Sequence, residues 1–421
     1  MHQNIIIYED LNEPFFNPLT YMRSVFELKC GMLSFLERIY TYYPEASYHL
    51  FTRDFLKPAL QQRYPSFQIN TSNIGLKSLV INGRLILNEE VKTLLDKNIN
   101  TNFIIIHNDE IVALGLEQNL LKTFITTSLA TKFDANNILS RLRKNNKIKI
   151  IYCKECLVIK NIWDLITVNG KVLRNDFNLI NRKGLILTNL NTQVCVTDED
   201  NIFIGKKTKV NPFVHLDASN GPIYIGEHVE IKAHVIIDGP TFIDDHTIIY
   251  PGYIRGNTTI GSHCRIGGEV INSIFQGYSN KAHTGFLGHS YIGEWVNLGA
   301  ATTTSNLKNT YSKIVIPTAN ETLTKTNLQF LGSLIGDYVK CGIGTMLNTG
   351  SSIGLGANIF GADGIMPKYI PNFSWGTSQK LIQYKLSNFL KTSRIVMKRR
   401  KKDLLKPEEE LLKYLYQSFN K

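Results

Sequence analysis

An aliphatic residue recurs every six positions through much of the second half of this 421-residue chain. This period matches neither the turn of a helix nor the alternation of a strand. Hexad repeats are typical of β-solenoids, in which each hexad forms a short strand and a turn, and three hexads close one triangular coil. The sequence therefore predicts a prism in which residues 18 apart share a face. The repeat falls into two regular runs: Ile225, Ile231, Ile237, Ile243 and Ile249, then Ile335, Cys341, Leu347, Ile353, Ile359 and Ile365.

The repeat breaks in two places within the solenoid. It is irregular around 271–288, and it is lost again between about Leu307 and Gln329. Such breaks predict loops that extend from the prism. Loops on a rigid scaffold are where catalytic and binding residues concentrate.

The chain is long for a single hydrophobic core, and its pattern changes along its length. Residues 1–190 alternate strand-like and helix-like segments, which predicts an α/β, Rossmann-like domain with a largely parallel sheet. Residues 191–375 carry the hexads, and 376–421 form a helical tail that we expect to cover the edge of the last coil. The expected strands are 4–8, 78–81 and 103–107, and the expected helices are 24–43, 89–95, 379–391 and 408–419.

The chain is basic, with a formal net charge of +12 and a run of cationic residues at Lys398–Lys402. This run suggests either an anionic partner or ligand, or simply a solvated helix face. The sequence carries no nucleic-acid-binding motif. No apolar run approaches the roughly 20 residues that span a bilayer, and the first residues lack a basic segment followed by an apolar one. We expect a cytoplasmic protein with no membrane span.

Two features raise the question of a metal. Cys153 and Cys156 could be half of a zinc site, a redox pair or two ordinary thiols at a strand end. His228 and His246 are 18 apart, so they should stack on one face of the prism, as zinc ligands do in some trimeric hexapeptide enzymes. A catalytic zinc site needs three protein ligands, and no third ligand stands at a related spacing. No metal site is therefore expected in the solenoid.

The densest polar stretch lies in the first interruption and just after it, between Gly277 and Asn309. Solenoid corners need glycine and small residues, but they do not need a lysine, two histidines, a tryptophan and several asparagines. His283 could accept a proton near neutral pH, as acyl transfer to an amine requires. A histidine in a turn can equally be a satisfied structural residue.

The stretch KAHTGFLGHSYIGEWVNLGAATTTSNLKN resembles the acetyltransferase half of GlmU, the bifunctional enzyme that makes UDP-N-acetylglucosamine. Longer motifs resemble a Bacteroidetes-type variant of the GlmU-like family, a sugar nucleotidyltransferase family. These motifs are LTYMRSVFELKCGMLSFLERI, WDLITVNGKVLRNDF, LDASNGPIYIGEHVEI and GGEVINSIFQGYSNKAH. The resemblance implies a left-handed parallel β-helix, a homotrimer, and transfer of an acetyl group from acetyl-CoA to an amino sugar phosphate such as glucosamine-1-phosphate.

The resemblance also implies roles for individual residues. His283 matches the general base that deprotonates the amine, and Asn306 matches an asparagine beside the acetyl group and coenzyme. Asn297 and Arg255 match residues that bind the sugar phosphate, and we assign Lys281 to the anionic substrate. Phe286 and Leu307 stand where GlmU has tyrosines, which leaves the acceptor sugar open.

The first domain departs from the usual nucleotidyltransferase pattern. Its opening strand runs into residues 9–14, which lack the glycines that cradle phosphates. Arg23 is the candidate phosphate ligand in their place, and 108–110 is the candidate site for Mg²⁺. Transfer of a nucleotidyl group from UTP, and a degenerate domain that binds a nucleotide sugar or stabilises a trimer, both stay open. So does a solenoid scaffold that has lost activity altogether.

Overall fold

The computed structural model describes residues 4–10, 12–71, 77–118, 120–121, 148–317, 323–361 and 364–419. Its contacts divide the chain into two compact units. The N-terminal unit is Met1–Leu28 with Leu33–Ile162, and the C-terminal unit is Lys29–Met32 with Trp163–Lys421. Residues 163–190, which the sequence analysis assigned to the first domain, therefore cluster with the solenoid.

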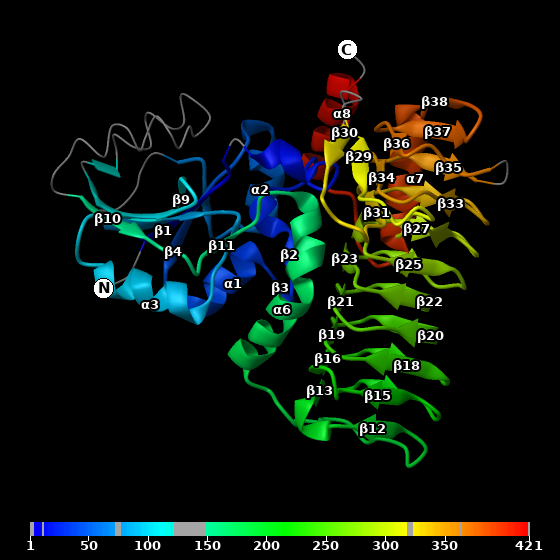
Figure 1. The fold of residues 1–421 in the computed structure, drawn as a ribbon. Helices are drawn as coiled ribbons and strands as arrows, with labels where there is room; N and C mark the ends of the chain where they lie inside the picture. The colour runs from blue at the N-terminus through cyan, green and yellow to red at the C-terminus, as the bar shows by residue number, and fades with distance from the viewer. Residues whose placement is uncertain are drawn as a thin grey trace. The chain divides into compact units, whose positions relative to one another are not determined.

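The N-terminal unit is an α/β fold around a mixed sheet (Figure 1). The described strands follow the order β10-β8-β9-β6-β1-β4-β5. β9 is antiparallel to both β6 and β8, and the other pairs are parallel. The strands read as continuous apolar runs because both faces of the sheet are covered. Their bounds are β1 (Asn4–Tyr8), β4 (Ser47–Phe51), β5 (Gln68–Ile69), β6 (Lys77–Asn82), β8 (Phe103–His107), β9 (Glu110–Glu117) and β10 (Lys149–Tyr152).

The expected helix at 24–43 is wrong in its first half. A 3₁₀ turn (Val25–Glu27) is followed by two short strands, β2 (Lys29–Cys30) and β3 (Leu33–Ser34), and only then by α1 (Phe35–Tyr42). Two capping boxes explain the break, because Ser24 and Ser34 each pair with the glutamate three residues later. Gly31, at φ +78°, turns the chain between the strands. The described part of this unit also contains α2 (Lys57–Arg63) and α3 (Glu89–Asn98), and β7 (Leu85–Ile86) pairs with β11 (Leu157–Val158).

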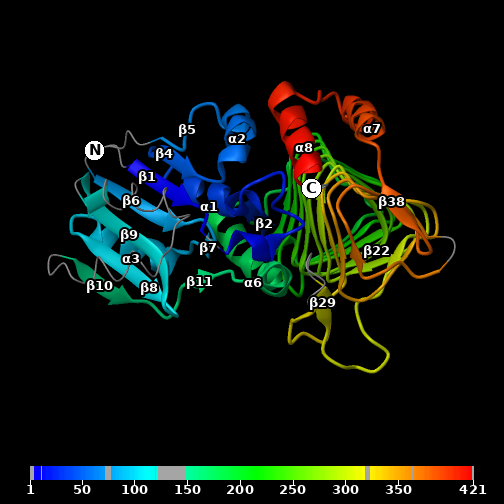
Figure 2. The same ribbon diagram turned by 90° about the horizontal axis from the view of Figure 1, so that it is seen from above.

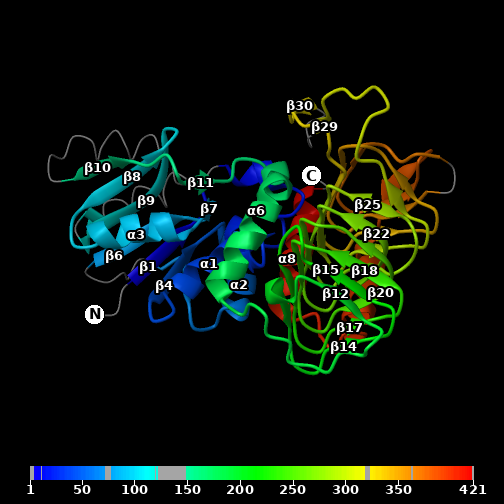
Figure 3. The same ribbon diagram turned by 60° about the horizontal axis from the view of Figure 1, so that its bottom comes forward.

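The C-terminal unit is a left-handed parallel β-helix, as expected (Figures 1 and 3). Its described strands stack into two long sheets. One sheet comprises β13 (Ile202–Ile204), β16 (Ile223–Ile225), β19 (Thr241–Ile243), β21 (Thr258–Ile260), β23 (Ile274–Gly277), β26 (Tyr291–Glu294), β31 (Ser333–Ile335), β34 (Ser351–Ile353) and β36 (Tyr369–Ile370).

The second sheet runs through β12 (Cys195–Thr197), β15 (His215–Asp217), β18 (Val235–Asp238), β20 (Ile248–Ile254), β22 (Arg265–Ile271), β24 (Asn280–Lys281), β27 (Asn297–Leu298), β32 (Lys340–Cys341), β35 (Asn358–Phe360), β37 (Ser374–Thr377) and β38 (Leu381–Gln383). Beside this path lie β14 (Lys209–Val210), β17 (Glu230–Ile231) and β25 (Phe286–Gly288). β28 (Thr303–Thr304) pairs with β33 (Met346–Leu347).

The hexad aliphatics form the core of the prism, with one exception. Ile225 through Ile359 of the two runs are buried, but Ile365 is 59% exposed and Met366 lies inside. The repeat therefore slips by one residue after Ile359. The sequence could not show this slip, because Ile365 and Met366 are both apolar and adjacent.

The two interruptions of the hexads have different structures. The second does leave the prism, as a hairpin of β29 (Val315–Pro317) and β30 (Leu323–Lys325) that projects from the coils in Figure 2. The first does not leave the prism. β24 pairs with β22 in register, with Asn280 opposite Arg265, so the stretch is a coil closed with 15 residues instead of 18.

Two helices follow the last coils, and the first of them begins later than expected. Residues 381–383 form β38, which pairs antiparallel with β37 and ends the sheet. α7 (Leu386–Lys398) replaces the helix expected at 379–391, and α8 (Lys406–Phe419) agrees with the helix expected at 408–419. The guanidinium of Arg400 donates to the carbonyl oxygen of His263, several coils before the end. The tail therefore packs along the side of the prism as well as at its last coil.

α6 (Ile162–Ile180) packs against the coils and holds residues 29–32 to them. The amide of Asn169 donates to Thr259 Oγ1 at 3.0 Å, and its oxygen accepts from the backbone N–H of Gly31 at 2.7 Å. Asp176 accepts from the backbone N–H of Met32 at 2.8 Å. Both polar side chains are buried, so the motif around α6 is structural in this unit.

Candidate functional site

A column of polar side chains runs across four successive strands of the second sheet. Strand pairing places Arg265 opposite Asn280, Asn280 opposite Asn297, and Asn297 opposite Lys340. The neighbouring residue on each of these strands points into the core, so the column faces outward. Asn280 Nδ2 donates to Asn297 Oδ1 at 3.3 Å. The prism therefore presents an ordered polar strip on one face.

A cavity of about 660 Å³ lies over this strip. Its other wall comes from α7 and the residues just after it. None of the described residues that line the cavity is acidic. The lining residues are Arg265, Tyr278, Asn280, Ala282, His283, Trp295, Asn297, Leu298, Gly299, Ala300, Lys340, Ile343, Thr392, Val396, Arg399 and Arg400.

His283 lies in the turn that follows β24, where its side chain is exposed and lines the cavity. Asn297 lines the same cavity from β27. The structure thus brings together two of the residues expected to act on the substrate, an imidazole and a carboxamide. An exposed imidazole next to a carboxamide and several cations can accept a proton beside an anionic ligand.

Lys281 occupies a different place from the one expected. It lies opposite Ile266 in the inward-facing column of the second sheet and is 2% exposed. Its Nζ donates to the carbonyl oxygens of Gly267 at 2.8 Å and His283 at 3.0 Å. Burial lowers the pKa of Lys281 to about 8. It therefore fixes the turn that carries His283 from beneath, instead of lining the cavity.

Asn306 also lies outside the cavity. Its amide nitrogen is 2.9 Å from Nδ1 of His289, and it packs over Gly288. Burial, followed by the charge of Arg255, lowers the pKa of His289 to about 4, so the ring is neutral at pH 7.

Arg255 is half exposed and pairs with Glu269 across adjacent strands, at 3.2 Å. It does not line the cavity. Within one chain, the residues expected from the family therefore fall into two groups. His283 and Asn297 lie in the cavity, while Asn306 lies beside His289 and Arg255 is paired with Glu269.

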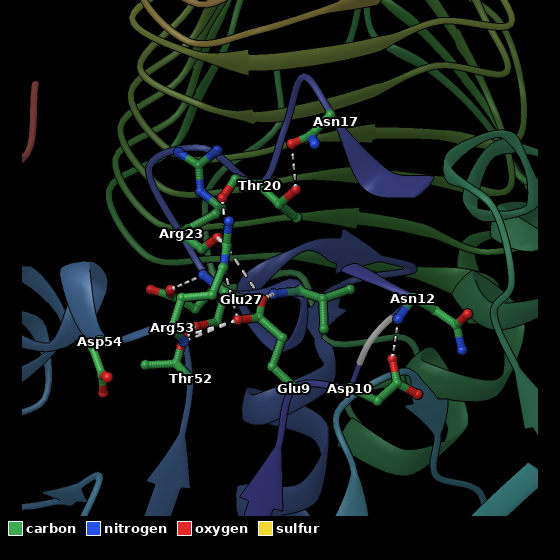
Figure 4. Close-up of polar contacts among 12 residues, drawn as sticks. Glu9, Asp10, Asn12, Asn17, Thr20, Arg23, Glu27, Thr52, Arg53 and Asp54 are labelled. Carbon is green, nitrogen blue, oxygen red and sulfur yellow. Dashed lines mark hydrogen bonds and ion pairs between the residues drawn. The ribbon is translucent and has the colours of Figure 1, made fainter. Parts of the chain in front are cut away.

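The N-terminal unit replaces the missing glycine-rich loop with a network of polar contacts (Figure 4). Glu9, directly after β1, accepts from Arg53 Nε at 3.0 Å, from Thr52 Oγ1 at 3.0 Å and from the backbone N–H of Val25 at 2.9 Å. Arg53 also donates to the carbonyl oxygens of Thr20 and Arg23. These contacts hold the segment after β1 against the edge of the sheet.

Arg23, the candidate phosphate ligand, is 3% exposed. Its guanidinium donates to the carbonyl oxygen of Leu19 at 3.0 Å. Arg23 is therefore buried and holds its own segment together through this hydrogen bond. A phosphate could reach the guanidinium only if that segment moved.

The carboxylates near the expected Mg²⁺ site contact an arginine. Arg84, 1% exposed, binds Asp10 at 2.5 Å and Glu110 at 2.7 Å. Asn108 and Asp109 form the turn between β8 and β9. Across the part of the chain that the structure describes, no three metal-ligating side chains come together as a metal site. Arg84 therefore neutralises the carboxylates that a cation would otherwise bind.

The cysteine pair and the histidines have structural explanations. Cys153 and Cys156 are buried free thiols, and burial, with a hydrogen bond that the Cys156 thiol donates to Cys153, raises the pKa of Cys156. A thiol that resists ionisation is a poor metal ligand. His228 and His246 do stack, with ring centroids 4.9 Å apart and planes within 16°, and His263 continues the stack. Parallel rings do not aim their nitrogens at one point, so the stack is not a chelate.

Four cationic residues line the cavity: Arg265, Lys340, Arg399 and Arg400. No sequence signal pointed to Arg265 and Lys340. The basic run gave a signal for Arg399 and Arg400, but their position depends on where α7 packs. Arg265 and Lys340 could have been found by counting along the strands from Asn297, had the registers been known.

Comparison with known proteins agrees with this architecture. Residues 5–184 match the family model for sugar nucleotidyl transferases. The bifunctional protein GlmU of Trichodesmium erythraeum is 28% identical over 204 residues, covering 40% of this chain and 42% of that protein. The GlmU of Prochlorococcus marinus is 26% identical over 276 residues, covering 56% and 55%, and that of Wigglesworthia glossinidia brevipalpis is 23% identical over 309 residues, covering 63% and 62%.

These similarities support a GlmU-like family for the chain. Its match to the GlmU of T. erythraeum spans less than half the length of that relative. The similarity supports a transferase. It does not show which of the two activities of GlmU this chain has.

Two solved structures are also similar in part. One is 4-diphosphocytidyl-2C-methyl-D-erythritol synthase from Anaerococcus prevotii, 13% identical, covering 41% of this chain and 99% of that one, with a TM-score of 0.29. The other is described as an acetyltransferase of Bacillus cereus, 16% identical, covering 52% and 91%, with a TM-score of 0.21. These scores are too low to support an argument. Among the described helices, none has the length and apolarity needed to cross a membrane.

Proposed function

We propose that this GlmU-like protein transfers an acetyl group from acetyl-CoA to the amine of an amino sugar phosphate, such as glucosamine-1-phosphate. The observation that carries the proposal is the cavity on the β-helix, where the exposed His283 and Asn297 lie among cationic side chains. Both substrates are anionic, and none of the described lining residues would repel them.

The chemistry requires few groups. The amine attacks the thioester carbonyl, so an N–C bond forms, the C–S bond breaks and coenzyme A leaves as a thiol. In the proposal His283 accepts the proton of the amine, and Asn297 donates to the sugar phosphate. Lys281 positions the turn of His283 through the hydrogen bond to its carbonyl oxygen.

Asn306 takes part in this reaction only if another copy of the chain brings it to the cavity. We therefore propose a homotrimer, as the family resemblance implies, in which the site is completed between subunits. A light-scattering mass close to that of one chain would contradict this assembly.

For the N-terminal unit we propose binding of a nucleotide, and nucleotidyl transfer stays one of two alternatives. The sugar nucleotidyl transferase match supports binding of a nucleotide sugar or UTP with Mg²⁺. The Arg53–Glu9 and Arg84–Asp10 pairs engage the two acidic residues directly after β1. These pairs favour the alternative of a degenerate domain that binds a nucleotide sugar or stabilises the trimer.

One experiment separates these possibilities. The protein is incubated with acetyl-CoA, glucosamine-1-phosphate, UTP and Mg²⁺, with one component omitted at a time, and the products are identified by mass spectrometry. N-acetylglucosamine-1-phosphate formed without UTP supports acyl transfer, and a UDP-sugar that requires UTP and Mg²⁺ supports nucleotidyl transfer. Absence of both products would support the scaffold.

A further inference from the structure

The basic run after α7 forms part of the cavity wall. Arg399 and Arg400 line the cavity, whereas Lys398, Lys401 and Lys402 are exposed and do not. Arg400 reaches the polar column directly, because its Nη2 donates to Asn280 Oδ1 at 2.8 Å. The helical tail thus contributes side chains to the same cavity as His283.

The arginine also sets the orientation of two carboxamides. Since Asn280 Oδ1 accepts from Arg400, its Nδ2 is directed to Asn297, where it donates to Oδ1 at 3.3 Å. Asn297 Nδ2 is then available as a donor to a ligand. Arg400 and Asn297 are in this way connected through one chain of hydrogen bonds.

Four cationic side chains converge on the cavity from opposite walls. Arg265 and Lys340 come from the prism, and Arg399 and Arg400 come from the tail. Burial, followed by the charges of Arg265 and Arg399, lowers the pKa of Arg400, and burial lowers that of Lys340 to about 8. Such like-charge crowding without a carboxylate on the lining is relieved when an anion binds.

The aromatic lining residues narrow the chemistry of that anion. Trp295 is stacked on Tyr278 at 4.4 Å, and Tyr338 lies on its other side at 6.5 Å. Both faces of the indole are therefore occupied and offer no platform for a base. Guanidinium groups bind phosphate oxygens in a bidentate manner, so the cationic end of the cavity suits a phosphate group.

We propose that Arg399 and Arg400 of the tail, with Arg265 and Lys340 of the prism, form a phosphate-binding subsite in the His283 cavity. The inference rests on the proposed function only in that the phosphate belongs to a substrate of His283. That phosphate is either one carried by coenzyme A or that of the sugar phosphate. The tail is then a binding element, not merely a cover for the last coil.

Calorimetric titration of the full-length protein tests this subsite and distinguishes the two sources. The ligands are coenzyme A, dephospho-coenzyme A, glucosamine-1-phosphate and glucosamine. The test variant is Arg399→Gln with Arg400→Gln, and the matched control is Lys398→Gln with Lys402→Gln, which removes the same charge from exposed positions. Arg399→Gln alone leaves the bond between Arg400 and Asn280 in place, so it reports on binding even if the double variant unfolds.

The double arginine variant should bind the phosphate-bearing ligand roughly 30-fold or more weakly, and the control should stay within about threefold of wild type. A lost preference for coenzyme A over dephospho-coenzyme A assigns the subsite to the coenzyme. A lost preference for glucosamine-1-phosphate over glucosamine assigns it to the sugar phosphate.

Unchanged affinities in both arginine variants, or an equal loss in the lysine control, would overturn the proposal. Binding and turnover also separate the two hypotheses. Phosphate-dependent binding by a protein without transferase activity would leave the subsite standing and refute the proposed function. Turnover at limiting substrate that is the same in the arginine variants and in wild type would refute the subsite and leave the proposed function standing.

Discussion

Replacing Lys281 by methionine should separate stability from function in the β-helix. The buried amine has a pKa of about 8, against 10.5 for an unburied lysine. Between these values the unfolded chain binds more protons than the folded one, so the stability of the wild type rises with pH across this window. The difference corresponds to about 3 kcal/mol. Methionine fits the apolar column, lacks this proton linkage and cannot donate to the carbonyl oxygen of His283.

We therefore expect Lys281→Met to be at least as stable as wild type at pH 7 and to lose about 3 kcal/mol relative to it by pH 10.5. Urea unfolding followed by tryptophan fluorescence measures this, because Trp163, Trp295 and Trp375 all lie in the C-terminal unit. The exposed Lys206→Met serves as the control and should show no such trend. A difference between Lys281→Met and wild type that stays flat from pH 7 to 10.5 would refute the reasoning.

Two further changes test other parts of the structure. Arg84→Met leaves Asp10 without its cationic partner, whereas Glu110 keeps Lys160 at 3.6 Å. The change should destabilise the N-terminal unit by about 3–5 kcal/mol, read from far-UV circular dichroism during urea unfolding; a loss below about 1 kcal/mol would contradict the role of this network. For His289, the folded pKa of about 4 lies below the ordinary 6.5, so stability is lost as the pH falls between them. His289→Gln should flatten this acid limb by up to about 3 kcal/mol, and an unchanged limb would show that folding does not lower the pKa of His289.

The hexad period was sufficient to predict the β-helix because its aliphatics face a common core. The period did not show that Lys281 faces inward. A lysine is normally exposed, so we predicted a contact with the substrate, whereas the strand register places Lys281 under the turn of His283. The prediction that Ile365 is buried was wrong for a different reason. Ile365 and Met366 are adjacent and both apolar, so the sequence does not show which of them faces the core.

Contacts between distant segments could not be read from local pattern at all. Residues 29–32 join the C-terminal unit through Asn169 and Asp176, more than 130 positions away. Arg400 likewise lines a cavity with Asn280, 120 positions earlier in the chain. His283 and Asn297 were found because a family motif marks them, while the cationic wall depended on the packing of α7.

The most direct test of the central claim is the rate at which acetyl-CoA is consumed with glucosamine-1-phosphate as acceptor. His283→Ala is compared with His215→Ala, a histidine on an earlier coil outside the cavity. The account predicts a loss of roughly 100-fold or more for His283→Ala, in the range expected for removal of a general base, and little change for the control. An active wild type whose His283→Ala variant turns over at the same rate would contradict it.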